Sequence, residues 1–173
     1  MKIDDLLLLN TGLRQYASSP EMDPLTEADA LQEAQLLDVG FDALASVVGL
    51  MFELRTALQL REANTGVLIA RGIRELAWSG PGRDTALMAW AVGSSHPQVM
   101  DGLFGLRLVM WPHPGAQLSL TAESAAFFVG DVPGLSEAPP DYTDLDRTTL
   151  GQQVAGWESP FEVVSAAFLN QGQ

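Results

Sequence analysis

The stretch VVGLMFELRTALQL, Val47 to Leu60, decides the fold class, because it fits a helix and a strand almost equally well. Its residue propensities favour a helix, and its partial alternation of apolar and polar residues favours a strand. The next run, VLIARGIRELAWSG (67–80), has β-branched and aromatic residues, and the polar, turn-rich EANTG (62–66) separates the two runs. Two such runs around a short turn predict a long antiparallel hairpin, so we interpret 47–60 as a strand.

Glu53 and Arg55 would lie together on the exposed side of this strand. The following strand offers Arg71, Arg74 and Glu75 as cross-strand partners, and each such pair contributes about 0.2–1 kcal/mol. A catalytic role would require these charges to lie inside a cleft with perturbed pKa values. The pattern favours surface ion pairs over a buried site.

Strand-like patterns continue on both sides of this hairpin. A short, glycine-punctuated first strand is predicted over LLDVGFD (36–42). The proline and glycine residues of PHPG (112–115) predict a second hairpin turn. Further strands are predicted over TALMAWAV (85–92), LFGLRLVMW (103–111), AQLSLTA (116–122) and AAFFVGDV (125–132).

Both chain ends are predicted to be helical. Residues 4–17 place leucines at helical spacing, and a shorter helix is expected from 24 to about 35. Near the C-terminus, SPFEVVSAAFL (159–169) offers Ser159 and Glu162 as a capping box. The predicted fold class is α+β, with a mostly antiparallel central sheet of about six to seven strands and helices at the N- and C-terminal ends.

Composition is that of a single globular domain spanning 1–173, with 47% hydrophobic and 18% charged residues. We divide it into an acidic helical N-terminal segment (1–35), a β-rich core (36–132), and an acidic linker with C-terminal helices (133–173). The absence of cysteine excludes disulfides, thiolate zinc sites and cysteine nucleophiles. The N-terminus MKIDDLLLLN lacks the features of an export signal, and no window reaches the roughly 18 apolar residues of a membrane span. We therefore expect a cytoplasmic protein, and its arginine-rich basic residues are typical of GC-rich bacterial genomes.

The net charge of −13 is unevenly distributed along the chain. Residues 1–42 carry nine acids and two basic residues, residues 43–130 carry six of each, and residues 131–173 carry seven acids and one arginine. Such a surface repels nucleic acid and anionic lipid and attracts basic partners. The simpler interpretation is that the charge serves only solubility.

The segment GDVPGLSEAPPDYTDLD (130–146) concentrates acidic residues around one tyrosine. It lacks the Asp-x-Asp-x-Asp-Gly core of a calcium loop. It is either a solvated linker or a binding edge at which carboxylates meet basic residues and an aromatic side chain anchors the contact. The candidate binding residues are Asp131, Glu137, Asp141, Tyr142, Asp144 and Asp146, together with Trp111 at the predicted turn tip MWPHPG.

Catalytic signatures are weak. GSSH (93–96) is not Gly-x-Ser-x-Gly and is interpreted as a polar loop between strands. His96 and His113, even with Asp84 or Asp101, show no recurring metal-ligand spacing. No glycine loop for phosphate is present either. We expect no catalytic residue, metal or cofactor, and we interpret the remaining tryptophans, Trp78, Trp90 and Trp157, as packing at the rim of the core.

The leading hypothesis is a non-enzymatic, acidic protein-binding domain with a basic protein partner. Its most concrete form is an immunity-type inhibitor of a basic toxin or nuclease. One alternative is a small-molecule-binding or hydrolytic domain with a pocket over the sheet, in which His96, His113, Asp101 or Glu53 are the polar groups. Another alternative is a structural subunit of a homo-oligomer. Neither nucleic acid nor a membrane is expected as a partner.

Overall fold

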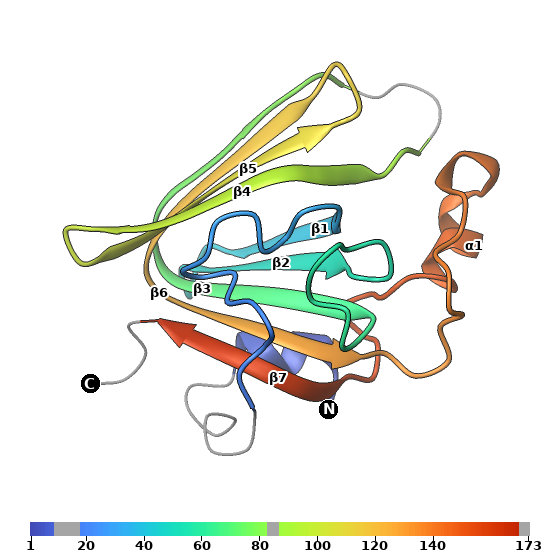
Figure 1. Ribbon diagram of the computed structural model, residues 1–173, viewed down its shortest axis with the longest axis horizontal. Coiled ribbons are helices and arrows are strands. Elements are labelled where there is room, and N and C mark those ends of the chain that lie inside the picture. Colours follow the sequence, from blue (N-terminus) through green and yellow to red (C-terminus); the bar gives the residue numbers. More distant parts are fainter. Residues whose placement is uncertain (9–17, 83–86, 170–173) are drawn as a thin grey trace.

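A computed structural model describes residues 1–8, 18–82 and 87–169 (Figure 1). Within these ranges the chain forms seven strands, all paired antiparallel, and three short helical turns. The α+β class predicted above is therefore wrong, since the described structure consists almost entirely of sheet. The elements are η1 (Ile3–Leu7), β1 (Gln35–Asp42), β2 (Val47–Glu53), β3 (Thr65–Ser79), β4 (Trp90–Met100), β5 (Leu103–Trp111), β6 (Ala116–Asp131), η2 (Tyr142–Asp144), α1 (Arg147–Gly151) and β7 (Glu162–Leu169).

The sheet folds over on itself because β3 and β6 are long and bent. The strand order is β3-β2-β1-β4-β5-β6-β7, and β3 also pairs with β6. The first half of β3 pairs with β2, but after Gly72, which has a φ of +66°, only its pairing with β6 continues. One layer, here called the lower layer, contains β1, β2, the first half of β3, the second half of β6, and β7. The upper layer contains β4, β5, the first half of β6 and the second half of β3 (Figure 1).

Apolar side chains form two clusters, one on each face of the lower layer. The inner cluster lies between the layers and includes Phe52, Phe104 and Phe127. The outer cluster packs η1 and the C-terminal segment against the lower layer, and it includes Met51 and Phe161. All seven residues of β2 are buried, because this strand is covered on both faces. This double burial explains why the sequence of β2 does not alternate.

The strand predicted over 47–60 is confirmed for 47–53 and wrong for 54–60. β2 pairs with β3 from Val47↔Arg71 to Glu53↔Thr65, and residues 54–64 form the connection. The register places Glu53 opposite Thr65, so the predicted pairing with charges on the following strand is also wrong. Arg74 pairs instead with Glu123 on β6, at 2.6 Å.

The helices predicted at the N-terminal end are not observed. Only a 3₁₀ turn, Ile3–Leu7, occurs in the described part of 4–17, and residues 9–17 lie outside the described residues. Residues 24–34 form turns, with short local hydrogen bonds such as Gln32 to Asp29 and Ala34 to Leu31, and their backbone also bonds to the edge of β4. The amide of Asp29 donates to the Ser95 carbonyl at 2.9 Å, and that of Glu33 donates to the Val92 carbonyl at 2.8 Å.

The C-terminal helix predicted over 159–169 is wrong, since Glu162–Leu169 is strand β7, paired with β6. A bulge leaves Val164 out of the ladder, so Phe161 and Val163 share a face with Phe168. The bulge gives the apolar residues a spacing that resembles a helix in the sequence. No capping box forms, because the Ser159 hydroxyl accepts a hydrogen bond from the Gly156 amide.

In the upper layer the predicted strands are confirmed for β5 and β6, but the strand predicted over 85–92 is wrong, because β4 spans Trp90–Met100. Leu103–Trp111 is confirmed as β5, and the predicted strands 116–122 and 125–132 merge into the single strand β6. GSSH, predicted to be a loop, lies within β4. None of the helices in the part of the chain that the structure describes has the length and apolar content that crossing a membrane requires.

The β6–β7 bulge can be tested at Gly130. A Cβ atom there would lie 2.5 Å from the Glu162 carbonyl oxygen and 2.6 Å from the Phe161 ring. Gly130→Ala should therefore lower the free energy of unfolding by about 1–3 kcal/mol in a urea titration, because the backbone must shift. The matched control is Gly151→Ala in α1, where a Cβ would have no neighbour within 4 Å. Equal effects of the two substitutions would contradict the observed pairing.

Candidate functional site: a cleft between the layers

The candidate site lies where the two layers are joined least. β1 and β4 pair only through Gln35↔Ala91 and Leu36↔Trp90, so β1 parts from β4 beyond Leu36, while residues 29–34 bond to the edge of β4 on the other side. Two adjoining hollows open on either side of this junction and share residues 36–38 and Trp90. We call the two hollows together the cleft.

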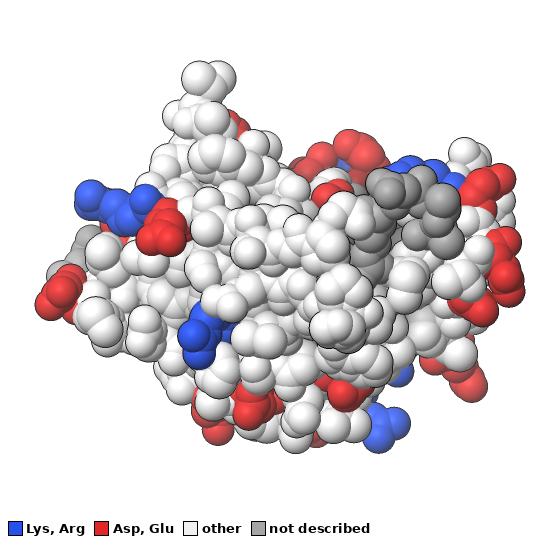
Figure 2. Space-filling model, turned by 90° about the horizontal axis from the view of Figure 1, so that it is seen from above, with Lys and Arg blue, Asp and Glu red and all other residues white. Residues whose placement is uncertain are grey.

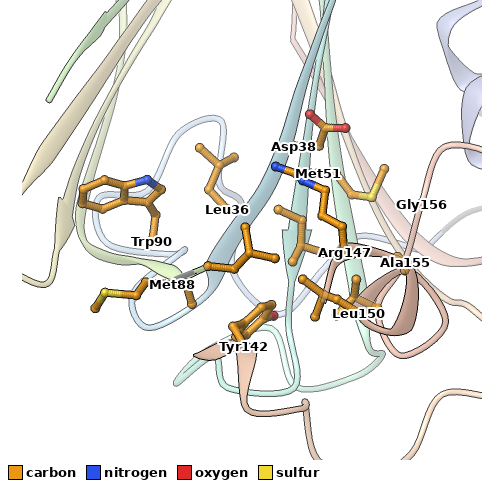
Figure 3. Close-up of a pocket in the computed structure, with 15 residues that line it drawn as sticks. Leu36, Asp38, Met51, Met88, Trp90, Tyr142, Arg147, Leu150, Ala155 and Gly156 are labelled. Carbon is orange, nitrogen blue, oxygen red and sulfur yellow. The ribbon is translucent and has the colours of Figure 1, made fainter. Parts of the chain in front are cut away.

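The larger hollow has a volume of about 430 Å³, within the range of small-molecule pockets. Leu36 and Met51 come from the lower layer, Met88 precedes β4, Trp90 is the first residue of β4, and Leu150 comes from α1 (Figure 3). The C-terminal segment thus forms one complete wall of this hollow.

The smaller hollow, of about 370 Å³, is lined almost entirely by apolar side chains. Val39 of β1 and Leu76 of β3 contribute to its walls. Trp78 and Trp90 meet edge to face, with ring centroids 5.8 Å apart. Trp78 is 47% exposed, and Met88, which lines the larger hollow next to Trp90, is 46% exposed. Large apolar side chains exposed together at one place mark an interaction site.

Most polar groups at the cleft already have partners. The indole Nε1 of Trp157 donates to Asp38 at 2.9 Å, and the hydroxyl of Tyr142 donates to Gln35 at 2.9 Å. Arg147 differs, because its guanidinium makes no hydrogen bond or ion pair with another described residue. Figure 3 shows its side chain extending from α1 toward Asp38. Arg147 is therefore the polar group at the cleft that is available to a ligand.

A buried ion pair holds the C-terminal wall in place. Arg55 donates to both carboxylate oxygens of Glu53, at 2.8 and 2.7 Å, and the two side chains are 4% and 1% exposed. Its remaining N–H groups donate to the carbonyls of Ser136, Ala138 and Gln153, at 3.0, 3.1 and 2.9 Å. All five guanidinium donors are thereby used.

This arrangement overturns the predicted surface position of Glu53 and Arg55. The pair is buried because the segment 132–161 covers the outer face of β2, which sequence reasoning took to be exposed. A guanidinium with no free donor binds the protein's own chain and has none left for a substrate. The pair is therefore a structural clamp that connects β2 to the wall of the cleft.

The predicted acidic binding residues separate into two groups in the structure. Asp141 and Asp146 begin η2 and α1, and each carboxylate accepts a backbone amide. Hydrogen bonds from Thr143 lower the pKa of Asp141, and those from Thr149 lower the pKa of Asp146. Asp144 is exposed in the same segment. Asp141 and Asp146 therefore remain charged at neutral pH beside Tyr142 and Arg147, which line the cleft.

The other predicted residues lie elsewhere or have a structural role. Asp131 accepts the Asn64 amide at 3.1 Å, which closes the end of β6. Glu137 is exposed in the segment before η2. Trp111 is exposed at the end of β5, on the outer face of the upper layer, and does not line the cleft.

Sequence reasoning missed the central residues of the site. Trp78 and Trp90 were interpreted as rim packing, and nothing in the sequence placed Arg147 near them. The available signal was that only residues 81–86 separate AWSG from LMAW in the sequence, so both tryptophans reach the same end of the molecule. Within the described residues, no group of three or more His, Asp or Glu side chains could hold a metal ion.

Tyr142 offers a test of the site's geometry. Burial, followed by the negative charge of Glu53, raises the pKa of its phenol above the ordinary value of 10.0. The unfolded chain loses this proton first, so the resulting stabilisation is present below pH 10 and is lost as the pH rises further. Phenolate absorbance should be measured against pH for the wild type and for Tyr142→Phe, and the difference between the two curves reports Tyr142 alone. This difference should appear only well above pH 10, at the pH where the protein also unfolds. Titration at the ordinary value in the folded protein would place Tyr142 in solvent.

No protein-family model matches this sequence, and no curated protein matches it. Among solved structures, an uncharacterized protein from Neisseria gonorrhoeae is similar, with 12% sequence identity and a TM-score of 0.44. The match covers 58% of this chain and 94% of that chain.

Proposed function

We propose that this chain is a non-enzymatic binding protein whose basic partner inserts an apolar side chain into the cleft. The observation that carries the proposal is the exposed apolar surface around Trp78, Met88 and Trp90, which adjoins a segment rich in carboxylates. An apolar anchor surrounded by charges of one sign is a common arrangement at protein interfaces.

The chemistry of the cleft supports binding over catalysis. Asp38 and Tyr142, two of its polar groups, already hydrogen-bond within the protein. The Glu53–Arg55 clamp beneath its wall has no unused donor. The smaller hollow, beside Trp78 and Trp90, therefore offers a ligand a mainly apolar surface.

The charge of the rim supports a basic partner. Asp141, Asp144 and Asp146 lie within six residues, and Arg147 is the basic side chain beside them. Across the whole chain the net charge is −13, which favours approach of a positively charged protein at low salt. A cytoplasmic, immunity-type inhibitor of a basic toxin or nuclease is the most concrete form of this proposal.

A second candidate function uses the same cleft for a small amphipathic acid. The specific observation is the guanidinium of Arg147, which has no polar partner among the described residues and extends into the larger hollow (Figure 3). A ligand with an apolar body and a carboxylate would satisfy both features. In this case Arg147→Met would abolish binding, whereas a basic protein partner should tolerate that change.

The charge contribution can be measured with two matched triple variants. In the first, Asp141, Asp144 and Asp146 become Asn, which keeps oxygen acceptors for the two capping amides and removes three charges. In the control, three exposed acids away from the cleft are neutralised to the same net charge: Glu21→Gln, Asp101→Asn and Glu162→Gln.

A partner purified from the native host is then used for association kinetics at two salt concentrations. The first variant should associate roughly tenfold more slowly at low salt, and the control should show a smaller effect, because steering depends on charges close to the contact. Equal rates for both variants, or an acidic partner, would exclude the proposed interface.

A further inference from the structure

A third hollow lies on the outer face of the upper layer, away from the two that form the cleft, and has a volume of about 390 Å³. The strand register aligns Glu75, Thr121, Gly105 and Gln98 in one row across β3, β6, β5 and β4. Residues directly opposite one another share a face, so their side chains stand together. Gly105 contributes no side chain at the centre, which makes the surface concave.

The neighbouring row adds Ser119, Arg107 and His96, aligned across β6, β5 and β4. Residues on the other side of the same strands, such as Leu106, Leu108 and Leu120, are buried in the inner cluster. The alternation of side chains along each strand thus places the polar ones on the outer face. They surround the depression that Gly105 leaves, because this residue has no side chain.

The polar groups of the hollow make few bonds with one another. The side chains of Glu75, Gln98, Arg107, Ser119 and Thr121 form no hydrogen bond or ion pair with another described residue. His96 Nε2 lies 3.1 Å from the Ser94 hydroxyl. Donors and acceptors of several kinds therefore converge on one depression and are free to bond a ligand.

The chemistry of these groups points to an uncharged, polyhydroxylated ligand. One carboxylate and one guanidinium balance each other, so the hollow favours neither an anion nor a cation. The carboxylate accepts hydrogen bonds, the guanidinium donates them, and the amide and the protein hydroxyls do both. Together they can bond the hydroxyl groups of a ligand, which also donate and accept.

An exposed aromatic ring extends this surface along β5. Trp111 lies four residues after Arg107 in β5, so the two side chains are on the same face, about 13 Å apart along the strand. The side chain of Trp111 is 48% exposed. A Cβ at Gly93 would lie 3.3 Å from its ring, so the indole lies over this glycine. The electron-rich face of an indole attracts the slightly positive C–H groups of a sugar ring. Figure 2, seen from above the upper layer, shows a broad area with few charged side chains on this side of the molecule.

We infer that the outer face of the upper layer binds an uncharged oligosaccharide, with sugar hydroxyls in the hollow around Gly105 and one sugar ring on Trp111. This site is separate from the cleft and does not depend on the proposed protein partner.

Amide and indole NMR signals of the full chain, recorded during titration with maltotriose, cellotriose and chitotriose, test this inference. At least one trisaccharide should shift the amides around Gly105 and the indole of Trp111 with millimolar affinity. Arg107→Met and Trp111→Ala should each weaken this binding roughly tenfold without lowering the melting temperature, because both residues are exposed. The Asp141/Asp144/Asp146 triple Asn variant should bind the sugar unchanged.

No shift with any of the three sugars at about 10 mM would overturn the inference, since that concentration exceeds millimolar dissociation constants. Shifts confined to Trp78 and Trp90 would also overturn it, because they would locate the sugar in the cleft. Neither result depends on the test of the basic partner, so the two proposals can fail separately.

Discussion

Replacing Arg55 by methionine should lower the free energy of unfolding by about 3–5 kcal/mol, the largest effect expected for a charged residue in this chain. The substitution leaves the Glu53 carboxylate, which is 1% exposed, buried without its partner. It also removes the donor from the carbonyls of Ser136, Ala138 and Gln153. The C-terminal wall of the cleft should then detach, so limited proteolysis should cut between residues 133 and 156 before the sheet unfolds.

Two controls distinguish the effect of breaking the buried Glu53–Arg55 pair from the effect of removing any positive charge. Arg74→Met breaks the exposed pair with Glu123 and should cost no more than about 1 kcal/mol in the same denaturant titration. The double variant Glu53→Leu/Arg55→Met should recover part of the loss, since no unpaired charge is left buried. An Arg55→Met cost equal to that of Arg74→Met would mean that the clamp is solvated.

Phe127→Ala should cost about 3–5 kcal/mol, because it removes a fully buried ring from the inner cluster. The ring of Phe127 lies 6.1 Å from that of Phe52, and a Cβ at Gly66 would lie 2.8 Å from it. The site therefore has little freedom to collapse into the space that the ring leaves.

The matched control is Phe41→Ala, which truncates a phenylalanine that is 54% exposed at the end of β1. Thermal and urea unfolding should give a change within about 0.5 kcal/mol for this variant. Similar losses for the two substitutions would contradict the placement of the inner cluster between the layers.

The sequence predicts strands best where one face of the strand is exposed to solvent and the other faces the core. β5 shows the alternation clearly, because Arg107 and Val109 face outward and their neighbours face the core. The turn before it also had a local signal: Asp101 and Gly102 have φ of 53° and 76° and form the two-residue hairpin between Met100 and Leu103. The strand predicted over 85–92 nevertheless ended before this Asp-Gly pair, whereas β4 runs from Trp90 to Met100.

The errors have tertiary causes. β2 is covered on both faces, so its sequence shows no alternation and its terminal Glu53 becomes buried. In β7, the bulge at Val164 gives apolar residues a helix-like spacing. Residues 24–34 have helical propensity, but bonds to β4 hold their backbone in turns. None of these effects is visible in a local window.

The cleft was even less accessible to sequence reasoning. Its walls combine residues 36–39, 76–78, 87–90 and 142–156, which only the folded sheet brings together. The acidic segment containing Tyr142 was recognised as a candidate, but the apolar surface beside it was not. Clusters of this kind depend on topology, because the contributing segments are far apart in the chain.

Photo-crosslinking from the cleft tests the proposed function most directly. A benzoylphenylalanine replaces Met88 at the cleft or, as the control, the fully exposed Leu44 in the β1–β2 turn. The account predicts that position 88, but not 44, crosslinks in the native host to one basic protein. This product should be lost at high salt and in the Asp141/Asp144/Asp146 triple Asn background. The same product from both positions, or an acidic partner captured at 88 regardless of salt, would contradict the account.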